Sequence, residues 1–225
     1  MQIPIRKITK AQMVWLVENK CTAHSHSYAS HYMCFLREKP DTAPLVEKIG
    51  IFDIETTGLK SNWSHMLCWC IKEQGKDIIH YDLVTSREAR DKNDARIVKS
   101  AIKEMKNYDR IIGYYSSGFD IPYTRSRALY QNIDFPGYKD LYTTDMYFIC
   151  RSKFRIHSNR LGAICEFFGI EAKNHPMNPE LWRRSGAGEK EALEEVLTHC
   201  KEDVESTDKV YQMLLKHMMI TKRSI

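Results

Sequence analysis

The sequence predicts an α/β fold, a mixed β-sheet flanked by helices, preceded by a small Cys/His-rich appendage. Its 225 residues suit one generous domain with an appendage, because single cores usually run to roughly 100 to 200 residues. From residue 47 onward, three strand-like segments are followed by a helical segment, another strand and more helices, an order typical of a mixed sheet covered by helices. Before that point the pattern is irregular and rich in cysteine and histidine. We therefore expect an appendage over residues 1–46 and the main domain over residues 47–225.

The strands of the main domain are predicted from short apolar runs. Residues 49–55 (IGIFDIE) have the β-branched and aromatic content of a buried strand, which Thr56, Thr57 and Gly58 end. A glycine-containing turn signal separates the next two runs, which should form a hairpin. The expected strands cover residues 49–55, 65–71, 77–84 and 110–114.

Helices are predicted where apolar residues recur at helical spacing. The expected helical segments cover residues 10–19, residues 86–107, a stretch opening near Phe119, residues 160–168 and residues 189–218. Between the appendage and the main domain, residues 39–44 (KPDTAP) have the composition of a linker.

Composition narrows the class of protein. The longest apolar runs fall far short of the roughly 20 residues that cross a bilayer, so we expect no membrane segment. The first residues contain no apolar stretch like that of a secretory signal, and we expect a cytoplasmic protein. Seven cysteines, an odd number, argue against a disulfide framework and for reduced thiols or a metal site. The net charge of +5 mildly favours a polyanionic partner.

Two acids lie in the first predicted strand. Side chains at i and i+2 of a strand project from the same face, so Asp53 and Glu55 should point together. Two ionised carboxylates this close repel each other and are costly to desolvate unless cations lie between them. Because Mg²⁺ and Mn²⁺ are hard ions that prefer oxygen ligands, the pair indicates a site for such an ion. The alternative is that one carboxylate faces solvent at a strand edge.

Two more acids come from distant parts of the chain. Asp120 stands at the start of a predicted helix directly after a short strand, and Asp203 lies within the last amphipathic segment. With these residues, the sequence resembles the DEDD exonuclease superfamily, which has a ribonuclease H-like fold. The first motif of that family matches residues 52–59 (FDIETTGL), the second matches residues 119–122 (FDIP), and the third falls near residues 199–203 (HCKED).

The resemblance covers about residues 48–216 and looks closest to the proofreading domains of family B DNA polymerases and similar free-standing nucleases. It implies a metal-dependent 3′–5′ exonuclease acting on single-stranded 3′ ends, with DNA favoured over RNA, and with replication or repair proteins as partners. Two Mg²⁺ or Mn²⁺ ions would be held by the four acids, one activating water and the other stabilising the leaving oxygen. The substrate contacts that it implies are Thr56, Thr57, Gly58, Leu59, Tyr115 and Phe119.

Two positions depart from the family pattern. Tyr115 stands where the second motif usually carries Asn, and the third motif has His199 at the spacing of the tyrosine subclass. Because residues four apart on a helix share a face, His199 and Asp203 can point into the site together. We expect His199 to orient or deprotonate the attacking water, the alternative being a histidine on the helix surface. Asp145 is interpreted as either a supporting acid or an exposed helix cap.

The appendage carries two Cys/His pairs, a Cys-x-x-His and a His-x-x-Cys, within residues 21–34. Four soft or borderline ligands in two close pairs suit tetrahedral structural Zn²⁺, whose bond energy would help a small unit to fold. The preferred ligands are Cys21, His24, His31 and Cys34, with His26 as a substitute. The alternative is a polar loop with free thiols.

Two basic clusters could contact phosphates and stack a base. One covers residues 151–160 around Phe154, and the other is Arg183 and Arg184 beside Trp182; the alternative for each is a solvated surface. Two other functions stay open for the whole chain: an endonuclease or structure-specific nuclease of the same fold, and a catalytically inactive zinc-containing module that binds nucleic acid.

Overall fold

The computed structural model describes residues 10–38, 40, 47–137, 140–171, 178–217 and 223–224. The chain divides into two compact units, Met1–Lys48 and Ile49–Ile225, whereas the sequence places the boundary between residues 46 and 47. In the first unit, the expected helix is α1 (Lys10–Glu18), and a short helix that the sequence did not indicate, α2 (Tyr32–Glu38), follows. Of the predicted linker over residues 39–44, only Pro40 lies within the described residues.

The second unit is built on a mixed sheet with the order β3-β2-β1-β4-β5-β6. Its strands are β1 (Ile49–Thr56), β2 (Met66–Glu73), β3 (Ile79–Leu83), β4 (Arg110–Gly113), β5 (Tyr142–Asp145) and β6 (Arg223–Ser224). β1 is an interior strand, antiparallel to β2 and parallel to β4, and β2 and β3 form the predicted hairpin. β5 continues the parallel part of the sheet, and β6 pairs with it antiparallel. The predicted mixed sheet is confirmed.

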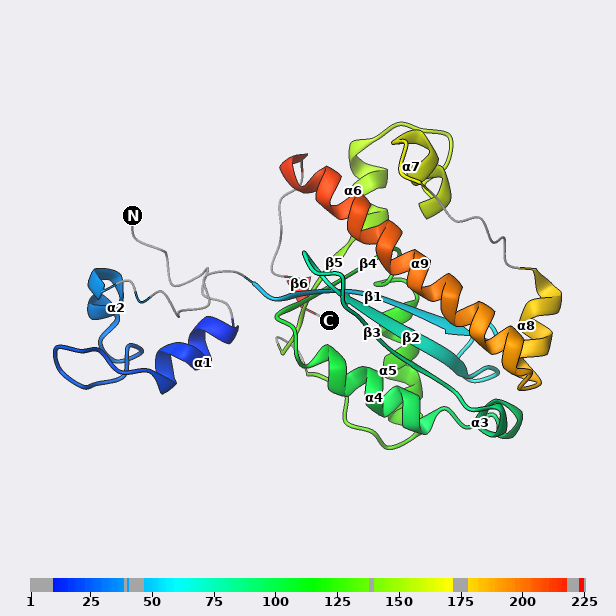
Figure 1. Cartoon of the computed structure of the whole chain (residues 1–225), viewed down its shortest axis with the longest axis horizontal. Coiled ribbons are helices and arrows are strands. Elements are labelled where there is room, and N and C mark those ends of the chain that lie inside the picture. Colours follow the sequence, from blue (N-terminus) through cyan, green and yellow to red (C-terminus); the bar gives the residue numbers. More distant parts are fainter. Residues whose placement is uncertain are drawn as a thin grey trace. The chain divides into compact units, whose positions relative to one another are not determined.

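Helices cover both faces of this sheet. Figure 1 shows α9 (Lys190–Leu214) lying across one face, with α4 (Ala95–Met105) and α5 (Asp120–Tyr130) on the opposite face. Both α9 and α4 bury an apolar stripe, as the helical spacing predicts. The end of the last predicted helix, at residue 218, lies outside the described residues; within them, α9 ends at Leu214 and a 3₁₀ turn, η2 (Leu215–His217), follows. No described helix is long and apolar enough to cross a membrane.

The single helix expected over residues 86–107 is wrong, because the structure divides this segment into α3 (Ser86–Asp91) and α4. Lys92 ends α3 in the left-handed conformation, with φ of 53°, and its N–H donates to the carbonyl oxygens of Ala89 and Glu88. The break turns Asp94 inward, where it is fully buried and its two carboxylate oxygens accept from Arg127 at 2.7 and 2.8 Å. A buried ion pair, invisible in the periodicity, therefore sets the start of α4.

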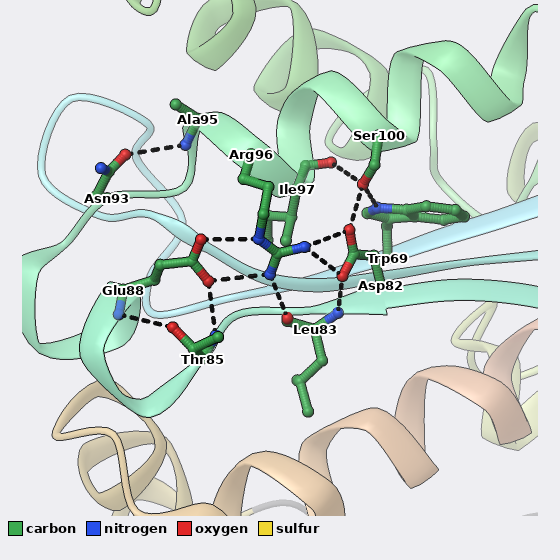
Figure 2. A network of polar contacts seen from close by, with 10 residues as sticks. All are labelled: Trp69, Asp82, Leu83, Thr85, Glu88, Asn93, Ala95, Arg96, Ile97 and Ser100. Atoms are coloured by element: carbon green, nitrogen blue, oxygen red, sulfur yellow. Dashed lines mark hydrogen bonds and ion pairs between the residues drawn. The ribbon is translucent and has the colours of Figure 1, made fainter.

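A polar network fixes α3 and α4 against β3 (Figure 2). The guanidinium of Arg96 donates to both carboxylate oxygens of Asp82, at 2.7 Å each, and to both of Glu88, at 2.8 and 2.9 Å. Ser100 donates to Asp82 at 2.6 Å and accepts from the indole N–H of Trp69 at 2.9 Å. One arginine of α4 thus joins β3 and α3 through charge-assisted hydrogen bonds.

Short elements complete the second unit: α6 (Met146–Lys153), α7 (Leu161–Phe167) and α8 (Pro179–Gly186). The sequence predicts α7, but it does not indicate β5, α6 or α8. β5 is hard to recognise because its four residues are mostly polar and its last three are buried, so no apolar alternation marks it. This unpredicted strand is important because its last residue, Asp145, lies next to the candidate site.

Candidate active site

The central strand β1 presents Asp53 and Glu55 from the face opposite Phe52 and Ile54, next to the buried Ile51 of their own face. Phe52 and Ile54 are buried, whereas the two acids between and after them are only partly buried. The pairing of β1 with β2 is regular through Glu55 and shifts directly after it, so the acids stand where the regular ladder ends. The i and i+2 spacing predicted from the sequence therefore gives a shared face on a strand that is held from both sides.

Asp120 opens α5 and lies against the same strand. Its side chain is buried, and its Oδ1 accepts from the backbone N–H of Ile54 at 3.1 Å. Burial raises the pKa of the Asp120 carboxyl to about 7, and the nearby charges of Asp145 and Asp203 raise it as well. A buried carboxyl among other acids is an environment that a cation would stabilise in its ionised form.

Helix α9 brings His199 and Asp203 to the acids of β1. The Nε2 atom of His199 lies 3.6 Å from Oε1 of Glu55 and 3.6 Å from Oδ2 of Asp203. These three side chains offer ligand atoms that all lie within 4.8 Å of one another. The helix is held to the strand next to the site, because the thiol of Cys200 donates to the backbone carbonyl oxygen of Asp53 at 3.5 Å. The oxygen-rich donor set suits a hard divalent cation.

All five side chains expected to be catalytic line one cleft of about 520 Å³. The cleft is lined by Asp53, Ile54, Glu55, Leu59, Lys60, Tyr114, Tyr115, Gly118, Phe119, Asp120, His199 and Asp203. Three of the expected substrate contacts, Leu59, Tyr115 and Phe119, are among them. Lys60 also lines the cleft, although the sequence analysis did not single it out as a site residue. Its position directly after the first motif, which carries Asp53 and Glu55, could have indicated it.

Thr56, Thr57 and Gly58, also expected to contact substrate, are not among the residues that line this cleft. The hydroxyl of Thr56 donates to the carbonyl oxygen of Gly58 at 2.8 Å. The hydroxyl of Thr57 lies 3.3 Å from Nδ1 of His65 and accepts from the backbone N–H of that residue at 3.1 Å. Their hydrogen-bonding groups are used to shape the loop that presents Leu59 and Lys60.

Asp145 is a helix cap, but a buried one, so the alternative of an exposed cap is corrected. Its carboxylate caps α6 by accepting from Tyr147 N–H at 3.0 Å. It also accepts from the N–H of Tyr115 at 2.9 Å and from both N–H and hydroxyl of Ser117, at 2.9 and 2.6 Å. Asp145 therefore fixes the loop between β4 and α5, which leads directly into Asp120.

Tyr115 adopts an uncommon backbone conformation in that loop, with φ of 63°. Its ring packs over Gly118, where an added Cβ would lie 2.6 Å from the ring, so a larger residue there would displace the ring. The ring also contacts Tyr147 and Phe148, with centroids 5.0 and 6.0 Å away, and it stays 47% exposed. An exposed ring held by other rings is a surface on which a base can stack.

A second hollow of about 420 Å³ adjoins these aromatic residues. It is lined by Tyr114, Tyr115, Tyr147, Arg160 and Leu161, so it shares Tyr114 and Tyr115 with the cleft. Of the predicted basic residues, Arg160 reaches this hollow. Tyr147 was missed by the sequence reasoning as a site residue, although the adjacent aromatic residues at 147 and 148 gave a signal.

The second basic cluster has carboxylate partners. Arg183 forms a bidentate pair with Glu180, at 2.6 and 2.9 Å, and Arg184 pairs with Glu189. These contacts agree with a solvated helix surface, the alternative given for this cluster.

Three comparisons relate the chain to known proteins. A family model described as the RNase_H superfamily matches residues 51–215. The uncharacterized protein MJ0365 of Methanocaldococcus jannaschii is 26% identical over 181 residues, covering 74% of this chain and 94% of that protein. The family B DNA polymerase of the hyperthermophilic archaeon Pyrobaculum calidifontis has a similar fold, with a TM-score of 0.62 at 20% identity over 78% of this chain. The chain spans about a quarter of the length of that polymerase.

The matched region contains most of β1, all of β2 to β5, α9 and every residue of the cleft. The chain therefore belongs to the RNase H superfamily.

Proposed function

We propose that the chain is a divalent-metal-dependent 3′–5′ exonuclease that hydrolyses phosphodiester bonds of single-stranded nucleic acid, with DNA preferred. The observation that carries the proposal is the meeting of Asp53, Glu55, Asp120, His199 and Asp203 in one cleft. These residues come from β1, α5 and α9, so only the folded chain brings them together. Superfamily membership and the fold of the polymerase support a nuclease, and the resemblance of the three motifs supports the polarity.

The acids fit two Mg²⁺ or Mn²⁺ ions. The carboxylates of Glu55 and Asp203 offer oxygen atoms close enough to hold one ion, and Asp53 and Asp120 extend the same carboxylate cluster. When bound, such ions would polarise the phosphodiester and stabilise the charge that develops on the leaving oxygen. A neutral or cationic ligand set would not serve this role, whereas four carboxylates offset the charge of two divalent ions.

The remaining side chains would handle water and substrate. His199 is placed between two carboxylates, where it would orient the attacking water or accept its proton. Tyr115, Leu59 and Phe119 would contact the terminal nucleotides, and the exposed ring of Tyr115 would stack a base where the family pattern has an amide. Replication and repair proteins are the partners that such an activity would serve.

The test is a cleavage assay on end-labelled single-stranded DNA and RNA, with Mg²⁺ or Mn²⁺ and with chelator. We expect stepwise shortening from the 3′ end that needs the cation and disappears in Asp53→Ala. The matched control is Asp134→Ala, which removes an acid whose side chain is 92% exposed and which should cleave like the unmodified chain. Equal cleavage by Asp53→Ala would overturn the proposal.

Two further measurements separate the alternatives. Cleavage of a circular single strand would indicate an endonuclease of the same fold, whereas binding without cleavage of any substrate would indicate an inactive module. Titration with Mn²⁺, followed by the electron paramagnetic resonance of free ion, reports occupancy without turnover. Weaker Mn²⁺ binding in Asp53→Ala than in Asp134→Ala is expected, and equal binding would remove Asp53 from the metal site.

A further inference from the structure

The first unit has a very small apolar core. Among the residues that the structure describes, its buried apolar cluster consists of Leu16, Cys21, Tyr28, Cys34 and Phe35. Two of these five side chains are thiols, which leaves little apolar area to offset the conformational entropy of a unit of this size. Units this small usually rely on disulfides or a metal for stability, and both cysteines are free thiols in the structure. The core therefore raises the question of what holds these residues together.

Two imidazole nitrogens lie beside the two buried thiols. Nδ1 of His24 is 3.8 Å from Sγ of Cys21 and 3.5 Å from Sγ of Cys34. Nδ1 of His31 is 3.9 and 4.0 Å from the same two sulfur atoms. Zinc binds sulfur at about 2.3 Å and nitrogen at about 2.0 Å, which at a tetrahedral angle separates S from N by about 3.5 Å. The four measured distances are close to that value.

Local backbone structure brings each pair together. Cys21 and His24 belong to a turn in which Cys21 N–H donates to the carbonyl oxygen of His26, and Ser25 N–H donates to that of Cys21. His31 directly precedes α2, and Cys34 N–H donates to its carbonyl oxygen at 2.9 Å, so this pair spans the first turn of the helix. The turn supplies Cys21 and His24, and the start of α2 supplies His31 and Cys34. The β-bridge Lys20↔Ser27 closes the turn, and the four ligand atoms lie within 4.8 Å of one another.

His26, the substitute ligand considered from the sequence, has another position. Its Nδ1 lies 3.1 Å from Nε2 of His31. If His31 binds a metal through Nδ1, its Nε2 carries the proton and can donate to His26. Such a contact fixes the tautomer and the ring orientation of a metal-binding histidine. His26 is therefore a positioning residue that orients His31, and it is not itself one of the four ligands.

We propose that Cys21, His24, His31 and Cys34 bind one structural Zn²⁺ in tetrahedral geometry, and that this ion orders the first unit. The two thiolates and two neutral imidazoles fill all four positions, so the site is closed to water and substrate. It differs in chemistry from the carboxylate cleft, which offers hard oxygen ligands. The zinc site does not depend on the proposed nuclease activity.

The first test measures the metal content of the full chain, purified without chelator. We expect one zinc per chain by elemental mass spectrometry, retained by Asp53→Ala and lost by Cys34→Ser. Cys165→Ala is the matched thiol control, because it removes another buried cysteine, in α7, and should keep its zinc. Full zinc content in Cys34→Ser would overturn the proposal, as would absence of zinc from the unmodified chain after incubation with excess Zn²⁺.

Cobalt substitution tests the tetrahedral geometry of the metal site in the unmodified chain. This test is therefore informative even where Cys34→Ser fails to fold. Co²⁺ bound by two thiolates and two imidazoles should give the intense visible absorption of a tetrahedral site and a sulfur-to-cobalt charge-transfer band. Weak absorption typical of octahedral cobalt would contradict the assignment. His26→Ala should keep the tetrahedral spectrum but bind roughly 10- to 100-fold more weakly, because it removes only the positioning contact. Loss of the tetrahedral spectrum in His26→Ala would make His26 a ligand.

Hydrogen exchange locates the structural effect. Removal of zinc from the full chain should speed amide exchange in peptides covering residues 10–38 and leave peptides from β1, β2 and β4 unchanged. Unchanged exchange over residues 10–38 after verified zinc removal would refute the ordering role. Loss of nuclease activity plays no part in these readouts, so failure of either proposal can be recognised separately.

Discussion

Replacing Asp120 by asparagine should stabilise the protein in the absence of divalent cations. Burial raises the pKa of the Asp120 carboxyl from an ordinary value of 3.8 to about 7. Above that pH the carboxyl is ionised in the folded protein, and its burial lowers the free energy of unfolding. Asparagine has the same shape, and its oxygen can still accept from the backbone N–H of Ile54. The substitution therefore removes the buried charge and keeps the hydrogen bond.

The magnitude follows from the pKa. The shift from 3.8 to about 7 corresponds to about 4 kcal/mol at 1.36 kcal/mol per pH unit, fully expressed only above pH 7. The new amide N–H₂ costs about 1–3 kcal/mol where it lacks an acceptor, which leaves an expected gain of about 1–3 kcal/mol at pH 8. Because the folded-state pKa is raised, the contribution of the Asp120 carboxyl to stability falls as pH rises from about 4 through 7, and the advantage of Asp120→Asn grows over the same range.

Urea unfolding in EDTA at pH 5 and pH 8 measures this effect, with the exposed Asp134→Asn as control. Asp120→Asn should unfold at higher urea than the unmodified chain at pH 8, with a smaller difference at pH 5. Mg²⁺ or Mn²⁺ should stabilise the unmodified chain much more than Asp120→Asn, since the cation needs the carboxylate. A less stable Asp120→Asn at pH 8 in EDTA would refute the idea that burial of this charge costs folding energy.

Three other substitutions test separate contacts. Arg96→Met should lower the free energy of unfolding by about 1–2 kcal/mol, a value reduced for solvent screening because this arginine is 46% exposed. The control Arg87→Met, at an arginine that is 87% exposed, should change it by less than about 0.5 kcal/mol. Equal urea midpoints for the two variants would argue against a stabilising role of the network. Asp145→Ala should lower the free energy of unfolding by about 2–4 kcal/mol and slow cleavage, because it leaves partly buried N–H groups of the loop unpaired, and Asp145→Asn should restore part of both. An unchanged cleavage rate in Asp145→Ala would mean that the loop does not position Asp120. Tyr115→Ala, in a cleavage-deficient Asp53→Asn background, should bind a labelled single strand roughly 5- to 100-fold more weakly, whereas Tyr115→Phe should bind nearly as well as the chain with Tyr115. Fluorescence anisotropy measures the affinity, and equal affinities of Tyr115→Ala and the chain with Tyr115 would exclude stacking.

The parts of the site that the sequence predicts are those where chemistry and spacing act together. Asp53 and Glu55 share a strand face because strand side chains alternate, and His199 and Asp203 share a helix face because they are four residues apart. Both patterns are local, so a single sequence contains them. The two Cys/His pairs are local in the same sense, and the structure gathers all four side chains.

The parts that the sequence does not predict depend on distant contacts. The break at Lys92 follows from the burial of Asp94 beside Arg127, which lies 33 residues further along the chain. β5 is polar and only four residues long, and it is a strand because β4 offers it a parallel partner. Asp145 could not be assigned from its neighbours, since its partners at 115 and 117 come from another loop.

The backbone N–H of Ile54, which donates a hydrogen bond to the carboxylate of Asp120, lies between the two acids of β1. Three carboxylates are therefore held by one three-residue stretch of backbone. Adding or deleting one residue within β1 would turn Asp53 and Glu55 to the face that Phe52 and Ile54 now occupy, and would separate Asp120 from its donor. Such a change should abolish the site as a whole, with no partly working form. The loop around residues 59–63, where Leu59 and Trp63 are 79% and 84% exposed, is under no such constraint, and it is the place where a change of length could alter the substrate preference and leave the acids in position.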